Sequence, residues 1–476
     1  MGSGGTPNVL AGRYASERMR ALWSPERRVV LERRLWLAVL EAQRKLGLDV
    51  DQAVVDAYEA VVEVVDLESI AAREAVTRHD VKARIDEFCA LAGHESIHLG
   101  MTSRDVTENT EQLLIIESLQ VVRDDLVAVI ARLADLAEAH ASTVMVARTH
   151  NVAAQATTLG KRFADAAAET MLGYSRVAEL LDRYPLRGIK GPVGTRLDQL
   201  DLLGSAEAVD ELESLVAEHL GVGRVLDASG QTYPRSLDLD VVAALVQAVS
   251  GPASLATTVR LMAGHGLASE GFGDGQVASS AMPHKANARS SERIGALTAV
   301  LDGHLAMAAS LAGRQWNEGD VSCSAVRRVM LPDAFCAADG LLHTALAVLE
   351  ELRIDREAMA TEFRRFLPVL ATTRLLTALV RAGMGREAAH AILAEPTRNA
   401  AQQAGRDDPV DLDGLLDQLA ADDRVPLGRD ELTRLLAEPE RFTGTASRQT
   451  ARVVEAARRI AARHPEAAAQ PAELRL

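Results

Sequence analysis

A seam of apolar residues that begins near residue 108 constrains the fold more than any other feature of the sequence. Its members, alternately three and four residues apart, are Leu119, Val122, Leu126, Val129, Leu133 and Leu136. This spacing predicts one long helix packed in a bundle. The same character returns over 238–264 and 292–313, where Pro252 is expected to kink or split the first helix. We therefore expect an all-α protein built around long helices.

The remaining sequence fits a helical protein of several units. Residues 25–48 keep helical apolar spacing after Ser24, a candidate N-cap, and only 3% of all residues are aromatic. No period-two stretch is long enough for a sheet core. Beyond about residue 365 the periodic runs shorten between prolines. We expect three helical domains: an N-terminal domain (1–107), a central bundle (108–364) and a C-terminal domain (365–476).

Charge and composition exclude several classes of protein. The net charge is -15, and Lys and Arg are scattered, which argues against a nucleic-acid surface. We find no signal peptide and no uncharged stretch of about 18 residues, so we expect no membrane contact and a cytoplasmic location. The three cysteines lie far apart, and no metal-ligand pair or Gly-rich phosphate loop occurs. We therefore expect no metal and no organic cofactor.

Polar clusters interrupt the helical pattern at 77–80 (TRHD), 98–105 (HLGMTSRD) and 148–162 (RTHNVAAQATTLGKR). Such clusters at helix ends are typical of binding and catalytic sites. Thr149 and His150 are expected just before a helix, where an imidazole titrating near neutral pH can act as a general acid. A histidine bonded to a backbone carbonyl for structural reasons is the alternative, and the same alternative holds for His79 and His98.

A fourth cluster, residues 277–293, is too polar to be core. Ser279, Ser280, Lys285 and Asn287 can present hydroxyl, ammonium and amide groups to an anionic ligand, and Gly275 gives the approach flexibility. A solvated loop with an incidental lysine is the alternative.

The motifs decide between these alternatives. SSAMPHKAN (279–287) resembles the S-S-x-M-P-x-K-x-N signature of the fumarase/aspartase superfamily, and the clusters at 98–105 and 148–162 match two further motifs of that superfamily. Within the superfamily RYASERM (13–19), TRHD, GQTYPR (230–235) and SCSAVRR (322–328) resemble the adenylosuccinate lyase family.

The resemblance implies three helical domains, a homotetramer and active sites shared by three subunits. It also implies a nucleotide substrate: cleavage of adenylosuccinate to AMP and fumarate, and of SAICAR to AICAR and fumarate. Both reactions are β-eliminations, in which a carbanion beside a carboxylate needs stabilisation by positive charge and hydrogen-bond donors.

By the same resemblance Ser279 is the base that removes the Cβ proton and His150 is the acid that protonates the leaving nitrogen. Lys285 and Asn287 stabilise the dianionic intermediate, and His79 orients the succinyl or phosphate end of the substrate.

The resemblance also implies substrate-binding residues. Arg13 and Tyr14 would hold phosphate, and Thr102 with Ser103 would hold the fumaryl carboxylate. The other implied residues are Arg78, Asp80, His98, Thr149, Gln231, Ser280, Met282, Arg293, Ser324 and Arg328. For any single arginine among them a surface salt bridge is the alternative.

Three positions depart from the family pattern: Ala278 replaces Gly, Ala288 replaces Pro, and Gly319 stands where many members carry Arg. The third removes a phosphate contact. Two other functions therefore stay open: the same elimination on a different succinyl-amine or nucleoside analogue, and a non-catalytic structural homologue.

Overall fold

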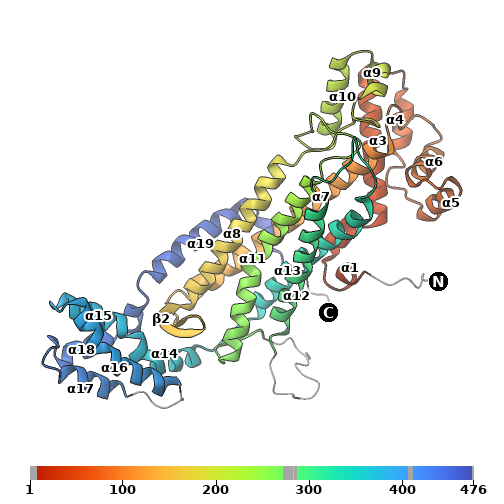
Figure 1. Cartoon of the computed structure of the whole chain (residues 1–476). Coiled ribbons are helices and arrows are strands. Elements are labelled where there is room, and N and C mark those ends of the chain that lie inside the picture. The colour runs from red at the N-terminus through yellow and green to blue at the C-terminus, as the bar shows by residue number, and fades with distance from the viewer. Residues whose placement is uncertain (1–7, 272–281, 283–286, 406–410, 474–476) are drawn as a thin grey trace.

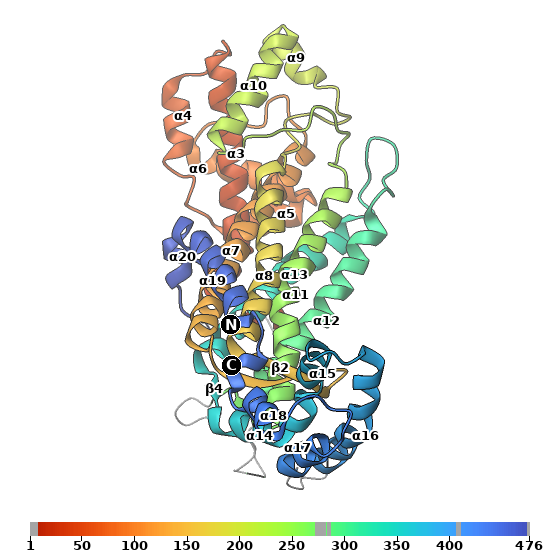
Figure 2. The same cartoon turned by 90° about the vertical axis from the view of Figure 1, so that its left-hand side faces the viewer.

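An elongated helical bundle carries a smaller group of helices at each end (Figures 1 and 2). The computed structural model describes residues 8–271, 282, 287–405 and 411–473. Helices dominate every part of the described chain, which confirms the all-α fold.

Five long helices form the bundle. They are α7 (Ser103–Ala139), α8 (Leu159–Arg183), α11 (Ser236–Gly264), α12 (Arg289–Leu311) and α13 (Ser324–Glu351). Helix α7 packs against α8 and α13, and α11 packs against α8 and α12. Leu119, Val122, Leu126 and Leu133 on the predicted seam are fully buried in the shared core. The seam therefore faces the core as predicted.

Helix α11 runs through Pro252 without a break, so the predicted split is wrong. Pro252 is buried, and Ala248 and Leu255 on either side of it lie in the core. Packing on both sides offsets the single backbone hydrogen bond that proline removes.

Residues 241–259 of α11 carry no charged side chain. The sequence therefore does contain an uncharged stretch of about 18 residues, and the prediction that it has none is wrong. Two described helices, α11 and α12, are long and apolar enough to cross a membrane by length and composition alone. In α11, 56% of the apolar window is buried inside the chain, against 28% in α12. Buried helices of water-soluble proteins pass the same test, so this is weak evidence for a membrane span.

The N-terminal group of helices precedes the bundle. Its members are α1 (Val9–Arg13), α2 (Glu17–Leu22), α3 (Pro25–Lys45), α4 (Gln52–Glu59), α5 (Leu67–Thr77) and α6 (Asp80–Ala92). Ser24 accepts a hydrogen bond from the Arg27 amide at 3.1 Å, which confirms the predicted cap. Helix α9 (Leu197–Leu203) joins α10 (Ala206–His219), and α10 packs on α3 although it lies within 108–364.

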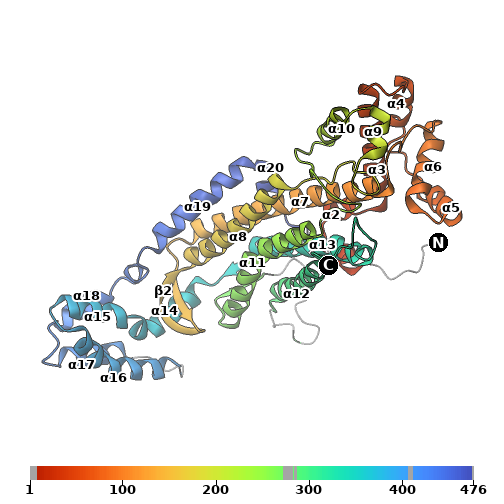
Figure 3. The ribbon, with the colours of Figure 1, turned by 45° about the horizontal axis from the view of Figure 1, so that its top comes forward.

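The C-terminal group lies at the other end of the bundle (Figure 3). It comprises α14 (Arg356–Leu370), α15 (Thr372–Arg381), α16 (Arg386–Gly405), α17 (Leu412–Ala420), α18 (Arg429–Leu436) and the short 3-10 helix η1 (Pro439–Phe442). The chain then returns, because α19 (Ala446–Arg463) packs on α7 and α8, and α20 (Pro465–Ala469) packs on α7. The exact domain boundaries stay a prediction.

A β-hairpin occupies the segment expected to lead directly into a helix. Strand β1 (Val144–Thr149) pairs antiparallel with β2 (Val152–Thr158), and the turn between them has positive φ at His150 (53°) and Asn151 (62°). Two such residues are typical of a tight type I′ turn. The placement of His150 at a helix start is therefore wrong; α8 begins only at Leu159. A second, two-residue pair joins β3 (Ala268–Ser269) to β4 (Arg353–Ile354).

Close packing of α8 on α11 should depend on Gly173. A Cβ at this position would lie 2.7 Å from Cα of Ala248, a backbone atom that cannot move aside. We expect Gly173→Ala to lower the free energy of unfolding by about 1–3 kcal/mol. Gly264→Ala is the matched control, since nothing lies within 4 Å of its Cβ. Thermal unfolding of both variants tests this, and equal melting temperatures would contradict it.

Candidate active site

A cavity of about 240 Å³ lies beside the start of α6 and the first turns of α7 and α13. Its lining includes five of the predicted residues: His79, Asp80, Ser103, Ser324 and Arg328. They come from three motifs that are far apart in the sequence. The fold therefore brings these motifs together within one chain.

His79 reaches the cavity as the N-cap of α6. Its Nδ1 accepts a hydrogen bond from the Lys82 amide at 3.3 Å, so in the neutral ring the proton is on Nε2. The side chain is about half exposed, and the preceding Arg78 has a φ of 52° at the end of α5. Burial opposes ionisation of Asp80, but Arg84 at 3.0 Å overcomes it and lowers the pKa of Asp80. The cap therefore leaves the Nε2–H free to donate to a ligand.

Thr102 and Ser103 start α7, where the helix presents its unpaired amides. The Thr102 amide donates to Asp105 Oδ2 at 2.8 Å, which fixes the first turn. Nearby, His98 has a φ of 67° and its Nδ1 accepts from Trp36 Nε1 at 3.0 Å. Burial lowers the pKa of His98, so this ring is neutral at neutral pH.

Arg327 and Glu111, which line the cavity, belong to a buried network of charges. Arg327 donates to Glu111 at 2.5 Å, to Asp238 at 2.8 Å and to the Tyr233 hydroxyl. Tyr233 in turn donates to Asp238 at 2.7 Å. The Arg327 side chain is only 2% exposed, so its charge is stabilised by these partners rather than by water.

The sequence reasoning missed this network. A signal was present, because Asp105, Glu108 and Glu111 recur every three residues just before the apolar seam of α7 begins, on the same long helix. Ionised side chains on a buried face require cationic partners. Arg327 stands directly before the predicted Arg328.

Two further arginines line the cavity. Arg28 lies 3.4 Å from Glu111, and Arg104 lies 3.0 Å from Glu108, a carboxylate that Arg235 also contacts at 2.8 Å. Arginines thus share carboxylates around this cavity. Such a site favours an anionic group with several acceptor oxygens.

Other predicted residues lie outside this cavity. The ring of Tyr14, at the end of α1, lies 5.8 Å from the guanidinium of Arg293 on α12. Arg13, the last residue of α1, is exposed. The Gln231 amide donates to the Glu318 carbonyl at 2.5 Å. Gly319 follows with a φ of 141°, and a Cβ there would lie 3.0 Å from Thr232 Oγ1. This backbone therefore disfavours an arginine, or any other side chain, at Gly319.

Thr149 and His150 lie in the hairpin near the C-terminal group of helices, whereas His79 lies at the opposite end of the bundle (Figures 1 and 3). The structure does not bring the two histidines together within one chain. Ser279, Ser280 and Lys285 lie outside the described residues, as does Ala278. Met282 is 44% exposed, and Asn287 lines another cavity with Ala288 and Glu270.

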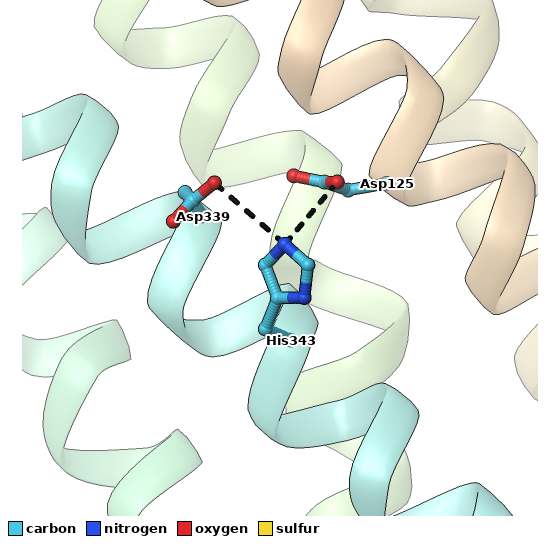
Figure 4. A group of neighbouring side chains, drawn as sticks. All are labelled: Asp125, Asp339 and His343. Atoms are coloured by element: carbon cyan, nitrogen blue, oxygen red, sulfur yellow. Dashed lines mark ion pairs between the residues drawn. The ribbon is translucent and has the colours of Figure 1, made fainter. Parts of the chain in front are cut away.

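Among the described residues, Asp125, Asp339 and His343 have the spacing of a metal site, with donor atoms within 4.8 Å of one another (Figure 4). The hydrogen bonds argue against a metal. His343 Nδ1 accepts from the Glu473 amide at 3.1 Å, so in the neutral ring Nε2 carries a proton and has no lone pair for a cation. The residues present do not fit a metal ion.

Loss of Arg327 should destabilise the whole molecule. Arg327→Met would leave the buried carboxylates of Asp238 and Glu111 without their main partner, at a cost of about 3–5 kcal/mol. Arg328→Met, one residue further and exposed, should change stability by less than about 0.5 kcal/mol. Denaturant unfolding of the two variants makes the comparison, and similar midpoints would refute the assigned role of Arg327.

The chain resembles known proteins over nearly its whole length. The sequence matches the family described as Lyase over residues 14–301, and the family described as Adenylosuccinate lyase C-terminus over residues 368–453. Adenylosuccinate lyase of Saccharomyces cerevisiae is 34% identical over 458 residues, which cover 94% of this chain and 93% of that protein. The Pyrococcus horikoshii adenylosuccinate lyase is 30% identical over 455 residues, or 93% of this chain and 96% of that protein.

Solved structures share the fold at lower identity. The 3-carboxy-cis,cis-muconate lactonizing enzyme of Pseudomonas putida has a TM-score of 0.80 at 21% identity, covering 95% of this chain and 100% of its own. A fumarate lyase of Mesorhizobium sp. has a TM-score of 0.79 at 21% identity, covering 93% and 98% respectively. Taken with the sequence matches over nearly the whole chain, this places the protein in the adenylosuccinate lyase family.

Proposed function

We propose that the protein eliminates fumarate from adenylosuccinate, giving AMP, and from SAICAR, giving AICAR, in the cytoplasm. The cavity beside α6, α7 and α13 carries this proposal. It gathers His79, Asp80, Ser103, Ser324 and Arg328 from three separate motifs and surrounds them with arginines suited to an anionic substrate.

The chemistry needs one acid, one base and a group that holds negative charge. His150 donates the proton to the departing nitrogen, and Ser279 removes the Cβ proton of the succinyl group. Lys285 and Asn287 stabilise the dianion that forms between the two steps. The serine acts as a base only where water is excluded and positive charge is near.

We further propose a homotetramer whose active sites each draw on three subunits. The separation of His150 from His79 supports this, because one chain alone holds them at opposite ends of its bundle. The apolar window of α12 also supports it: only 28% of the window is buried by its own chain, and Val300 and Met307 are 38% and 40% exposed. Such a face is suited to packing against another copy of the bundle.

Gly319 favours a second candidate, the same elimination on a different succinyl-amine. The arginine that many relatives carry at this position is absent, and the φ of 141° disfavours any replacement side chain. A substrate that lacks the phosphate bound by such an arginine would lose no contact at this position.

Fumarate release tests the function. Purified protein is mixed separately with adenylosuccinate and with SAICAR, and fumarate and the ultraviolet change of the base are measured. We expect release from both, with His150→Ala and Ser279→Ala each lowering kcat by about 100-fold or more. Arg424→Ala, an exposed change in the C-terminal group of helices, should be without effect.

Absence of fumarate from both substrates, with the protein folded, would contradict the proposed substrates. Release from dephosphorylated adenylosuccinate alone would favour the second candidate.

A further inference from the structure

Two carboxyl groups face each other in the core, and no arginine or lysine of the described chain forms an ion pair with either of them. Asp125 on α7 is 1% exposed and Asp339 on α13 is fully buried, with His343 one turn further along α13. His343 Nε2 lies 3.5 Å from Asp125 Oδ1 and 3.9 Å from Asp339 Oδ1. One oxygen of each carboxyl group lies within 4.8 Å of the other, and two buried carboxylates so close cannot both be ionised without a large cost.

The hydrogen-bond donors around the two carboxyl groups leave one oxygen atom without a partner. Asp339 accepts from the Ser16 amide at 2.6 Å and from Ser16 Oγ at 2.8 Å, and Asp125 Oδ1 accepts from Gln470 at 2.7 Å. Asp125 Oδ2 is buried and has no partner among the described residues. Figure 4 shows this oxygen on the side of Asp339. A proton between the two carboxyl groups would satisfy it.

The cluster is connected to the predicted nucleotide-binding residues. Ser16 follows Tyr14 closely and caps α2 by accepting from the Met19 amide at 3.1 Å. The next residue of α13, Gly340, lies directly under Tyr14, since a Cβ on Gly340 would be 2.8 Å from the Tyr14 Cβ. Asp339 and Gly340 together therefore set where the Tyr14 ring stands relative to Arg293.

We propose that Asp339 is a positioning residue for the nucleotide site: it shares one proton with Asp125, and in that state it anchors Ser16 and thereby holds Tyr14 in place. This inference rests on the proposed function. The C-terminal segment closes the same cluster, because Gln470 donates to Asp125 and the Glu473 amide donates to His343.

Other ionisable groups around the cluster do not replace the proton. From α2, Arg18 lies 3.0 Å from Asp124 rather than from Asp125, and Glu473 of the C-terminal segment accepts from the Glu17 amide at 2.9 Å. On α13 itself, burial raises the pKa of Cys336 to about 12, which keeps that thiol neutral. Among the described residues, no arginine or lysine contacts the Asp125–Asp339 pair, so His343, 3.5 Å from Asp125, is the ionisable side chain in contact with it.

The shared proton gives the cluster a defined dependence on pH. Burial raises the pKa of both Asp125 and Asp339 to about 7, whereas an aspartate in an unfolded chain has a pKa of about 4. The folded chain thus binds more protons between these values. The stability from the cluster is fully present below about pH 4 and is lost as the pH rises through about 7.

Three variants of Asp339 and its surroundings test the positioning role. Asp339→Asn supplies a permanent N–H donor in place of the shared proton, and Asp339→Ala removes the anchor of Ser16. We expect Asp339→Ala to raise KM about tenfold with kcat little changed. In the unmodified enzyme KM should rise above about pH 7, where the shared proton is lost. Asp339→Asn should keep the KM that the unmodified enzyme has below about pH 7 and show a smaller rise above it. Asp333→Ala, which within the described part of the chain loses one exposed hydrogen bond from Asn8, is the control.

Amide hydrogen exchange of residues 14–19 gives a readout that does not need activity. Exchange there should be faster in Asp339→Ala and unchanged in Asp339→Asn. If Asp339→Ala does not fold, Ser16→Ala takes its place, since it removes the hydroxyl bond to Asp339 and the cap of α2 but keeps the amide bond to Asp339.

Equal KM and equal exchange in Asp339→Ala and Asp333→Ala would overturn the proposal, as would stoichiometric metal in the purified protein. Failure of the proposed function looks different: the unmodified protein would release no fumarate, while the exchange and the stability at pH 5 and 8 would still respond to Asp339.

Discussion

The arrangement of the cavity depends most on the hydrogen bonds and the ion pair of the buried Asp105 carboxylate. It is fully buried near the start of α7, where one oxygen accepts from the amides of Lys190 (2.9 Å) and Gly191 (3.0 Å) and pairs with Arg187. The other oxygen accepts from the Thr102 amide. A buried charge needs such a full set of partners. Asp105 thereby fixes the loop after α8 against the motif that supplies Thr102 and Ser103.

The same face of α7 continues this role toward the cavity. Glu108 contacts Arg104 and Arg235, and Glu111 contacts Arg28 and Arg327. Each acidic residue joins α7 to a different segment, so the charges orient those segments relative to one another. The cost of burying them is offset only when all partners are in place, which explains why the lining of the cavity and the packing of the bundle are interdependent.

The sequence predicted what depends on local pattern. The α7 seam, the helices around 238–264 and 292–313, and the Ser24 cap were readable from spacing and capping chemistry, and the motifs around His79, Ser103 and Ser324 did meet in one cavity. The sequence pattern did not predict the hairpin at 144–158, because its strands are short and only half buried. Its turn also has positive φ at His150, where a glycine would have been the recognisable signal. The continuity of α11 at Pro252 and the return of α19 depend on tertiary packing, which periodicity does not reveal.

His79 and His150 lie at opposite ends of the bundle, and the central proposal is that each active site takes these two histidines from different chains. The most direct measurement mixes two inactive variants, His79→Ala and His150→Ala, dissociates them and lets them reassociate. If each site takes the two histidines from different subunits, random mixing restores both in about a quarter of the sites, and fumarate release returns to about that fraction. No recovery in the mixture, when unmodified protein regains activity under the same treatment, would contradict the account.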